Sequence, residues 1–87
     1  MQNTSEKIPY RSNFKGLPLS KQELEVIKLV AQGLTNREVA DRIGNSWETV
    51  RGHLNSVNHK LGTKTRTGAV VKVLKSGIIS LDSITLN

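Results

Sequence analysis

Residues 35–62, TNREVADRIGNSWETVRGHLNSVNHKLG, decide the fold because they hold two helix patterns separated by a short turn. Thr35 and Ser46 stand at the two helix starts, and both are residue types that cap a helix N-terminus. Gly44 stands between the patterns, where a helix that ends in the left-handed conformation needs a glycine. The stretch therefore predicts a short helix, a tight turn and a longer helix over about residues 46–61.

The longer helix is predicted to be apolar on one side only. At about 100° per residue, four apolar side chains fall within about 60° of one another. They are Val50, Leu54, Val57 and Leu61. The opposite side carries Glu48, Gly52, Asn55 and His59, with Arg51 and Ser56 beside them. Such a helix can dock on a core by one stripe and present a polar, hydrogen-bonding face to a partner.

Two further helices flank this pair in the sequence. One begins at Ser20 with a capping box to Glu23 and ends at Gly33. Its predicted buried residues are Leu24, Ile27, Val30 and Ala31. The other spans about residues 66–76 and ends at Gly77, with Val71 pointing away from its inner face. The inner face comprises Ala69, Val70, Val73 and Leu74. The sequence thus predicts an all-α, four-helix fold.

The remaining segments divide the chain. Residues 1–16 are polar and lack periodicity, so they predict a flexible N-terminal arm. The helical domain is expected over 17–80, with a C-terminal tail at 81–87.

Composition narrows the class of partner. The 87 residues carry a net charge of +6 and contain no Cys, which excludes disulfides and thiolate metal sites. Neither a signal peptide nor a membrane span is present, so a cytoplasmic location is expected. Residues 49–81 contain no Asp or Glu, which concentrates the positive charge in one segment. A polyanion is the natural partner of such a segment.

Three stretches resemble the LuxR/FixJ-type DNA-binding domain of bacterial transcription regulators: LSKQELEVIKLVAQGLTNREVADRI, TVRGHLNSVNHKLGTKTR and AVVKVLKSGII. The resemblance covers about residues 19–79. It implies a helix-turn-helix domain of the winged-helix-like superfamily without a wing. It also implies that helix 46–61 lies in the major groove of double-stranded DNA, and that two chains pair through helix 66–76 as a homodimer.

The same resemblance assigns residues to the interface. The base-facing positions are Arg51, Gly52 and Asn55, and all three lie on the polar side of the helix. The expected phosphate contacts are Thr35, Asn36, Ser46, Thr49, His53 and Lys60. The expected dimer contacts are Val71, Lys72 and Lys75.

Two residues depart from the family pattern. Asn45 stands where relatives usually have an aliphatic residue, and Trp47 where they usually have a polar or small one. We expect the Trp47 ring to be partly buried at the turn. Most relatives also carry an N-terminal sensory or receiver domain, and Met1 favours a stand-alone regulator over an excised C-terminal domain.

Two other functions remain open from the sequence. One is a sigma-factor region-4-like module that reads a promoter together with RNA polymerase, and the other is a small regulator-binding, anti-activator protein. An enzyme is not expected, because His53 and His59 do not share a helix face and no nucleophile–base pair can be assembled. We expect no metal and no cofactor.

Overall fold

The computed structural model describes residues 18–80, 82 and 84. It contains four α-helices: α1 (Lys21–Ala31), α2 (Asn36–Ile43), α3 (Trp47–Leu61) and α4 (Arg66–Ser76). These described residues contain no strand, so the all-α, four-helix prediction is confirmed. The arm predicted at residues 1–16 and most of the predicted tail lie outside the described residues.

Local side-chain bonds begin the helices where the sequence predicts. Ser20 and Glu23 form the capping box of α1, with Glu23 N–H donating to Ser20 Oγ at 3.0 Å. Thr35 caps α2 in the same way. Ser46 accepts the Thr49 N–H at 3.2 Å and so begins α3 directly after the turn. These caps satisfy backbone N–H groups that the first helical turn leaves unpaired.

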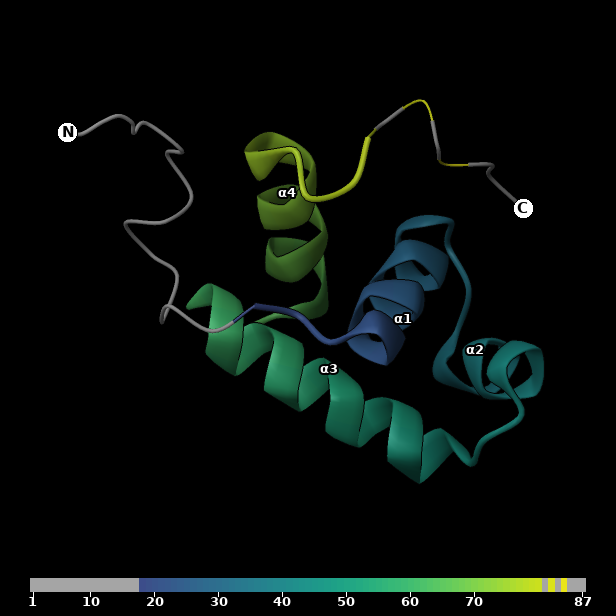
Figure 1. Cartoon of the computed structure of the whole chain (residues 1–87). Coiled ribbons are helices and arrows are strands. Elements are labelled where there is room, and N and C mark those ends of the chain that lie inside the picture. The colour runs from purple at the N-terminus through teal and green to yellow at the C-terminus, as the bar shows by residue number, and fades with distance from the viewer. Residues whose placement is uncertain (1–17, 81, 83, 85–87) are drawn as a thin grey trace, which may run out of the picture.

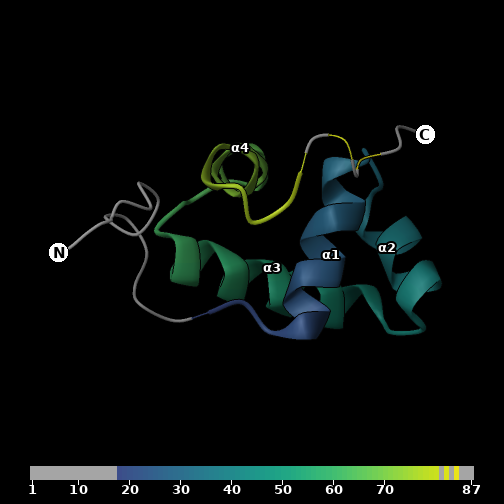
Figure 2. The ribbon, with the colours of Figure 1, turned by 45° about the horizontal axis from the view of Figure 1, so that its top comes forward.

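The helices α1 and α3 form the centre of the domain, since each contacts all three other helices. Figure 1 shows α3 along one edge, with the other helices on a single side of it. Figure 2 shows α2 and α4 at opposite ends of α3, with α1 between them. One long side of α3 is therefore left without a neighbouring helix.

The predicted stripe of α3 is confirmed as its buried side. Val50, Val57 and Leu61 are fully buried. The stripe predicted for α1 is partly wrong, because Val26 is fully buried while Leu24 and Ala31 are only half-buried. The buried side of α1 is turned toward Glu23 and Val26 because α1 packs against three helices instead of one.

We expect Leu54→Ala to lower the free energy of unfolding by about 2–5 kcal/mol, because Leu54 is a buried core residue and its truncation leaves a cavity. The neighbouring Asn55→Ala is the matched control, and its effect should stay within about 0.5 kcal/mol because Asn55 is exposed. Urea denaturation measures both. A larger loss for Asn55→Ala would contradict the observed orientation of α3.

Candidate nucleic-acid interface

The uncovered side of α3 carries the three residues predicted to face bases. Arg51, Gly52 and Asn55 are all exposed, on the side of α3 away from Val50 and Leu54. A Cβ atom built on Gly52 meets nothing within 4 Å, so this part of the surface is open. The geometry therefore places a guanidinium, a bare backbone position and an amide on one accessible face.

The predicted phosphate contacts lie at different depths. The exposed ones are Thr35, Ser46 and Thr49, and the half-buried ones are Asn36, His53 and Lys60. The hydroxyls of Thr35 and Ser46 both accept capping hydrogen bonds. His53 Nε2 is buried and has no hydrogen-bond partner among the described residues. A phosphate contact through this atom requires a change of the His53 rotamer.

Arg66 fixes the start of α2, a role that the sequence analysis did not give it. Its Nη1 donates to Asn36 Oδ1 at 2.6 Å, and its Nη2 donates to the backbone carbonyl of Leu34. These bonds join the first residue of α4 to the N-terminal end of α2 across 30 residues of sequence. The helix N-terminus that carries Thr35 and Asn36 is thereby held in a fixed position.

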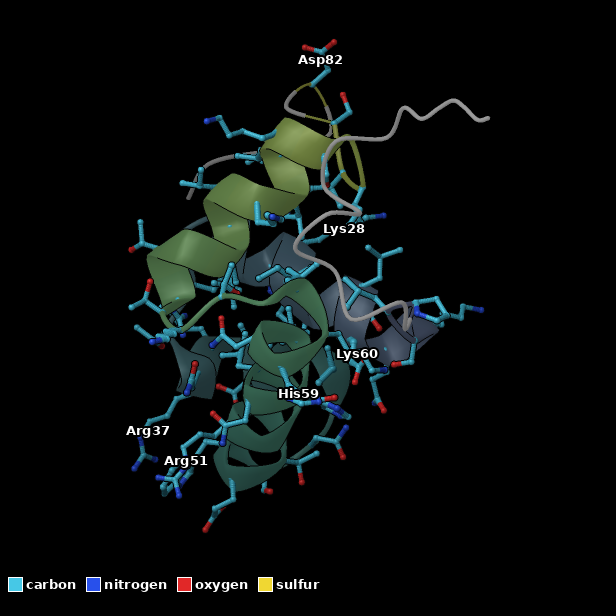
Figure 3. All side chains as sticks on the ribbon, turned by 90° about the vertical axis from the view of Figure 1, so that its left-hand side faces the viewer. Lys28, Arg37, Arg51, His59, Lys60 and Asp82 are labelled. Carbon is cyan, nitrogen blue, oxygen red and sulfur yellow. The ribbon has the colours of Figure 1, made fainter. Side chains whose placement is uncertain are left out.

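A second basic residue shares the Trp47 ring with Arg51, and the sequence did not predict it as a site residue. Arg37 of α2 and Arg51 of α3 both lie over the ring of Trp47. Figure 3 shows the two arginine side chains extending from the same end of the domain. Trp47 is 36% exposed, so its side chain is partly covered. The groups that lie over its ring include the charged guanidinium groups of Arg37 and Arg51.

Glu23 links α1 to α3 through a nearly buried carboxylate, which is 6% exposed. Its Oε1 accepts from Lys60 Nζ at 2.7 Å, and its Oε2 accepts from Ser56 Oγ at 2.6 Å. From the sequence, Glu23 is predicted only to take part in the cap of α1. Its position three residues before the buried Val26 and four before Ile27 is the available signal that it faces the core side.

These bonds change the acidity of Glu23. Burial alone raises the pKa of a carboxyl group, but the hydrogen bonds from Lys60, Ser56 and Ser20 and the charge of Lys60 lower the pKa of Glu23 from 4.5 to about 2. Lys60 is thus engaged by a carboxylate inside the domain. Its assignment as a phosphate contact stays a prediction, and any substitution of Lys60 will also disturb the α1–α3 contact.

The predicted dimer residues lie on α4. Val71 is 46% exposed and Lys75 is exposed, while Lys72 is half-buried. The prediction that Val71 points away from the core is confirmed. An exposed Val beside two cations is an accessible contact surface, although it is small.

Comparison with known proteins shows the family of the chain. A model of the family described as bacterial regulatory proteins, luxR family, matches residues 17–73. The chain belongs to the luxR family of bacterial regulatory proteins. It is similar to the spore germination protein GerE of Bacillus subtilis (strain 168), with 41% identity over 69 residues that cover 78% of this chain and 93% of that protein.

Longer proteins match this chain over about a third of their own length. The transcriptional regulatory protein YdfI of Bacillus subtilis (strain 168) is 37% identical over 65 residues, which are 75% of this chain and 30% of that protein. The crystal structure of the response regulator ChrA, from a heme-sensing two-component system, superposes with a TM-score of 0.71 at 33% identity. The match covers 79% of this chain and 34% of that one.

The luxR-family assignment makes the chain a DNA-binding domain of the transcription-regulator class, and this family is not one of enzymes. The described residues contain no group of three His, Asp or Glu side chains placed to hold a metal ion. Among the described helices, none is long and apolar enough to cross a membrane. The helix-turn-helix assignment of α2 and α3 is confirmed by the family.

We expect the bonds of Glu23 to stabilise this luxR-family domain in a pH-dependent way. Because folding lowers the pKa of Glu23, the stabilisation is complete above about pH 4.5 and is lost as the pH falls toward about 2. Glu23→Gln should remove about 1–3 kcal/mol of stability at pH 7 and flatten this acidic region of the profile. Thermal unfolding across pH measures both effects.

The control is Glu25→Gln, which makes the same change of charge at an exposed position of α1. It should leave the acid dependence in place. A Glu23→Gln profile that runs parallel to that of the unsubstituted chain would contradict the role of this carboxylate.

Proposed function

We propose that the chain binds double-stranded DNA sequence-specifically as a bacterial transcription regulator, with α3 in the major groove and with two chains acting as a homodimer. The observation that carries the proposal is the free outer face of α3, where Arg51 and Asn55 are exposed opposite a buried apolar stripe. Because bacterial DNA lies in the cytoplasm, the proposal includes a cytoplasmic location.

The side chains on this face suit base recognition. The guanidinium of Arg51 can donate two hydrogen bonds to guanine O6 and N7, and the amide of Asn55 can pair with adenine N6 and N7. Arg51 makes no ion pair with an acidic side chain in the part of the chain that the structure describes. Its donors are therefore available to a base edge.

Contacts with the phosphate backbone of DNA would fix the position of α3 in the groove. The N-termini of α2 and α3 carry the positive ends of the helix dipoles, and such ends favour phosphate. Thr35, Asn36, Ser46 and Thr49 lie at these two ends. His53 and Lys60 lie further along α3. Arg37 is added to the proposed phosphate contacts because it is positively charged and lies over the same Trp47 ring as Arg51.

The glycine of α3 supports a close approach of DNA. Gly52 lies inside a helix, where glycine costs about 0.5–1 kcal/mol relative to alanine. No neighbouring atom in the domain prevents a side chain there. The packing of the domain does not account for this glycine, whereas the approach of a DNA groove would.

The alternatives differ in what they predict. The luxR-family match favours a regulator over a sigma-factor region-4-like module. An anti-activator would use the same fold for protein contacts and would not need free cations on α3. RNA polymerase as an additional protein partner stays a prediction.

Selection of duplexes from a random pool tests the proposal most directly. We expect enrichment of one sequence, in two half-sites about one helical turn apart. Neutralising about 4–8 phosphates should make the affinity fall steeply as salt increases. A pool that shows no enrichment, or an affinity that does not change between low and moderate salt, would contradict DNA recognition.

We expect Arg51→Ala to cost about 1–3 kcal/mol of binding to the selected duplex and to abolish the preference at one base pair in each half-site. Affinity for scrambled DNA should change much less. Fluorescence anisotropy on both duplexes provides the comparison. An equal loss on both would make Arg51 a backbone contact, because phosphate contacts carry no sequence information.

Gly52→Ala should separate stability from function. The substitution should raise the free energy of unfolding by about 0.5–1 kcal/mol, since alanine favours the helix. It should also weaken binding to the selected duplex, because the added methyl group occupies the space that DNA approaches. Unchanged affinity in a stabilised variant would show that DNA does not approach Gly52.

Charge at the exposed face of α4 should interfere with pairing. We expect Val71→Glu to leave the fold intact and to lower affinity for a duplex with two half-sites by about tenfold or more, because the linkage between two bound chains is lost. Affinity for a single half-site is the internal control and should change little. Sedimentation that finds only one chain on the two-half-site duplex would contradict dimerisation.

A further inference from the structure

Trp47 lies near the turn, and neither the core nor helix capping explains it. It is the first residue of α3 and the sole tryptophan of the chain. Its ring is 36% exposed and is not part of the apolar core cluster. A large apolar side chain at the edge of a polar face therefore needs a reason outside the core.

The contacts of Trp47 give that reason. The Arg51 Cζ atom lies 5.6 Å from the ring centroid, and the Arg37 Cζ atom lies 6.0 Å from it. Both distances fall within the range in which a cation is attracted to the face of an indole ring. One arginine comes from each helix of the helix-turn-helix, and Figure 3 shows both extending outward.

This arrangement orders Arg51 without using up its hydrogen-bond donors. A guanidinium can lie against an aromatic ring while its N–H groups remain free in its own plane. A carboxylate partner would compete with a base for those same N–H groups. The ring also restricts the rotamers of a long side chain before binding, so that less side-chain entropy is lost when DNA binds.

We propose that Trp47 is a positioning residue that holds Arg51 ready for a guanine edge, and that it thereby sets the strength of discrimination at the base pair read by Arg51. The inference rests on the proposed function. Arg37, held on the same ring, contributes positive charge toward the neighbouring phosphates. Trp47 acts on recognition through Arg51, and not through a sequence contact of its own.

The test uses the full chain and the duplex enriched by selection. A second duplex carries a substitution at the base pair whose preference depends on Arg51. The discrimination factor is the Kd for the substituted duplex divided by the Kd for the selected one. It is measured for the unsubstituted chain, Trp47→Phe, Trp47→Leu, Trp47→Gln, Arg51→Ala and the double variant Trp47→Leu/Arg51→Ala. Circular dichroism identifies any variant that fails to fold, and either Leu or Gln at position 47 suffices for the test.

The expected pattern is specific to positioning. Trp47→Leu and Trp47→Gln should lower the discrimination factor by about three- to tenfold, the range of a cation–π contact that is partly desolvated. Trp47→Phe should retain most of it, because phenylalanine keeps an aromatic face. In the Arg51→Ala background, Trp47→Leu should change the discrimination factor no further. The matched control Arg37→Ala should lower affinity for both duplexes by the same factor.

The fluorescence of Trp47 gives a second readout in the absence of DNA. Arg51→Ala should make the ring more accessible to acrylamide, a neutral quencher, because the covering guanidinium is removed. An unchanged quenching constant would overturn the inference, since Arg51 would then not lie on the ring in solution.

Two binding results would overturn the inference while leaving the proposed function intact. If Trp47→Leu weakens binding to both duplexes equally, the ring contacts the DNA backbone. If it changes neither, the ring has no part in recognition. If the proposed function itself is wrong, the result is different: the unsubstituted chain would bind both duplexes equally, with a discrimination factor of about one.

Discussion

The orientation of α3 is the constraint on which the rest of the structure depends, and two kinds of contact fix it. The apolar stripe that includes Val50 and Leu54 docks on the core, and the Glu23 carboxylate holds Lys60 and Ser56 from the side of α1. The hydrophobic interaction made by the stripe is non-directional, so it tolerates some rotation of α3 about its own axis. The charged hydrogen bonds are directional, so together the two contacts determine which face of α3 remains free.

Contacts between the other helices determine which side chains lie near the start of α3. Arg66 ties the start of α4 to the start of α2. Trp47 then brings Arg37 and Arg51 together at this end of the domain. The result is a small all-helical domain with Arg37 and Arg51 at one end.

Local features of the fold could be predicted from the sequence, and cross-helix features could not. The caps at Ser20, Thr35 and Ser46 depend on residues three positions apart, so they could be predicted from the sequence. The buried stripe of α3 could be predicted too, because it depends on helical periodicity alone. The contacts of Glu23 reach 33 and 37 residues along the chain, and no local pattern encodes such a partner. The buried side of α1 was partly mispredicted for the same reason. For the interface, periodicity placed Arg51, Gly52 and Asn55 on the free side, but it could not reveal that Arg37 lies beside Arg51.

The central claim is that DNA meets the free face of α3 while the opposite stripe stays in the core. Amide chemical shifts of the full chain, followed by NMR during titration with the selected duplex, test it most directly. We expect the largest shifts along the outer side of α3, around Arg51 and Asn55, and at the N-terminus of α2, with small changes along the middle of α1. If the largest shifts occur on α1 while α3 is unaffected, the face presented to DNA lies elsewhere on the domain, and α3 is not the helix that meets DNA.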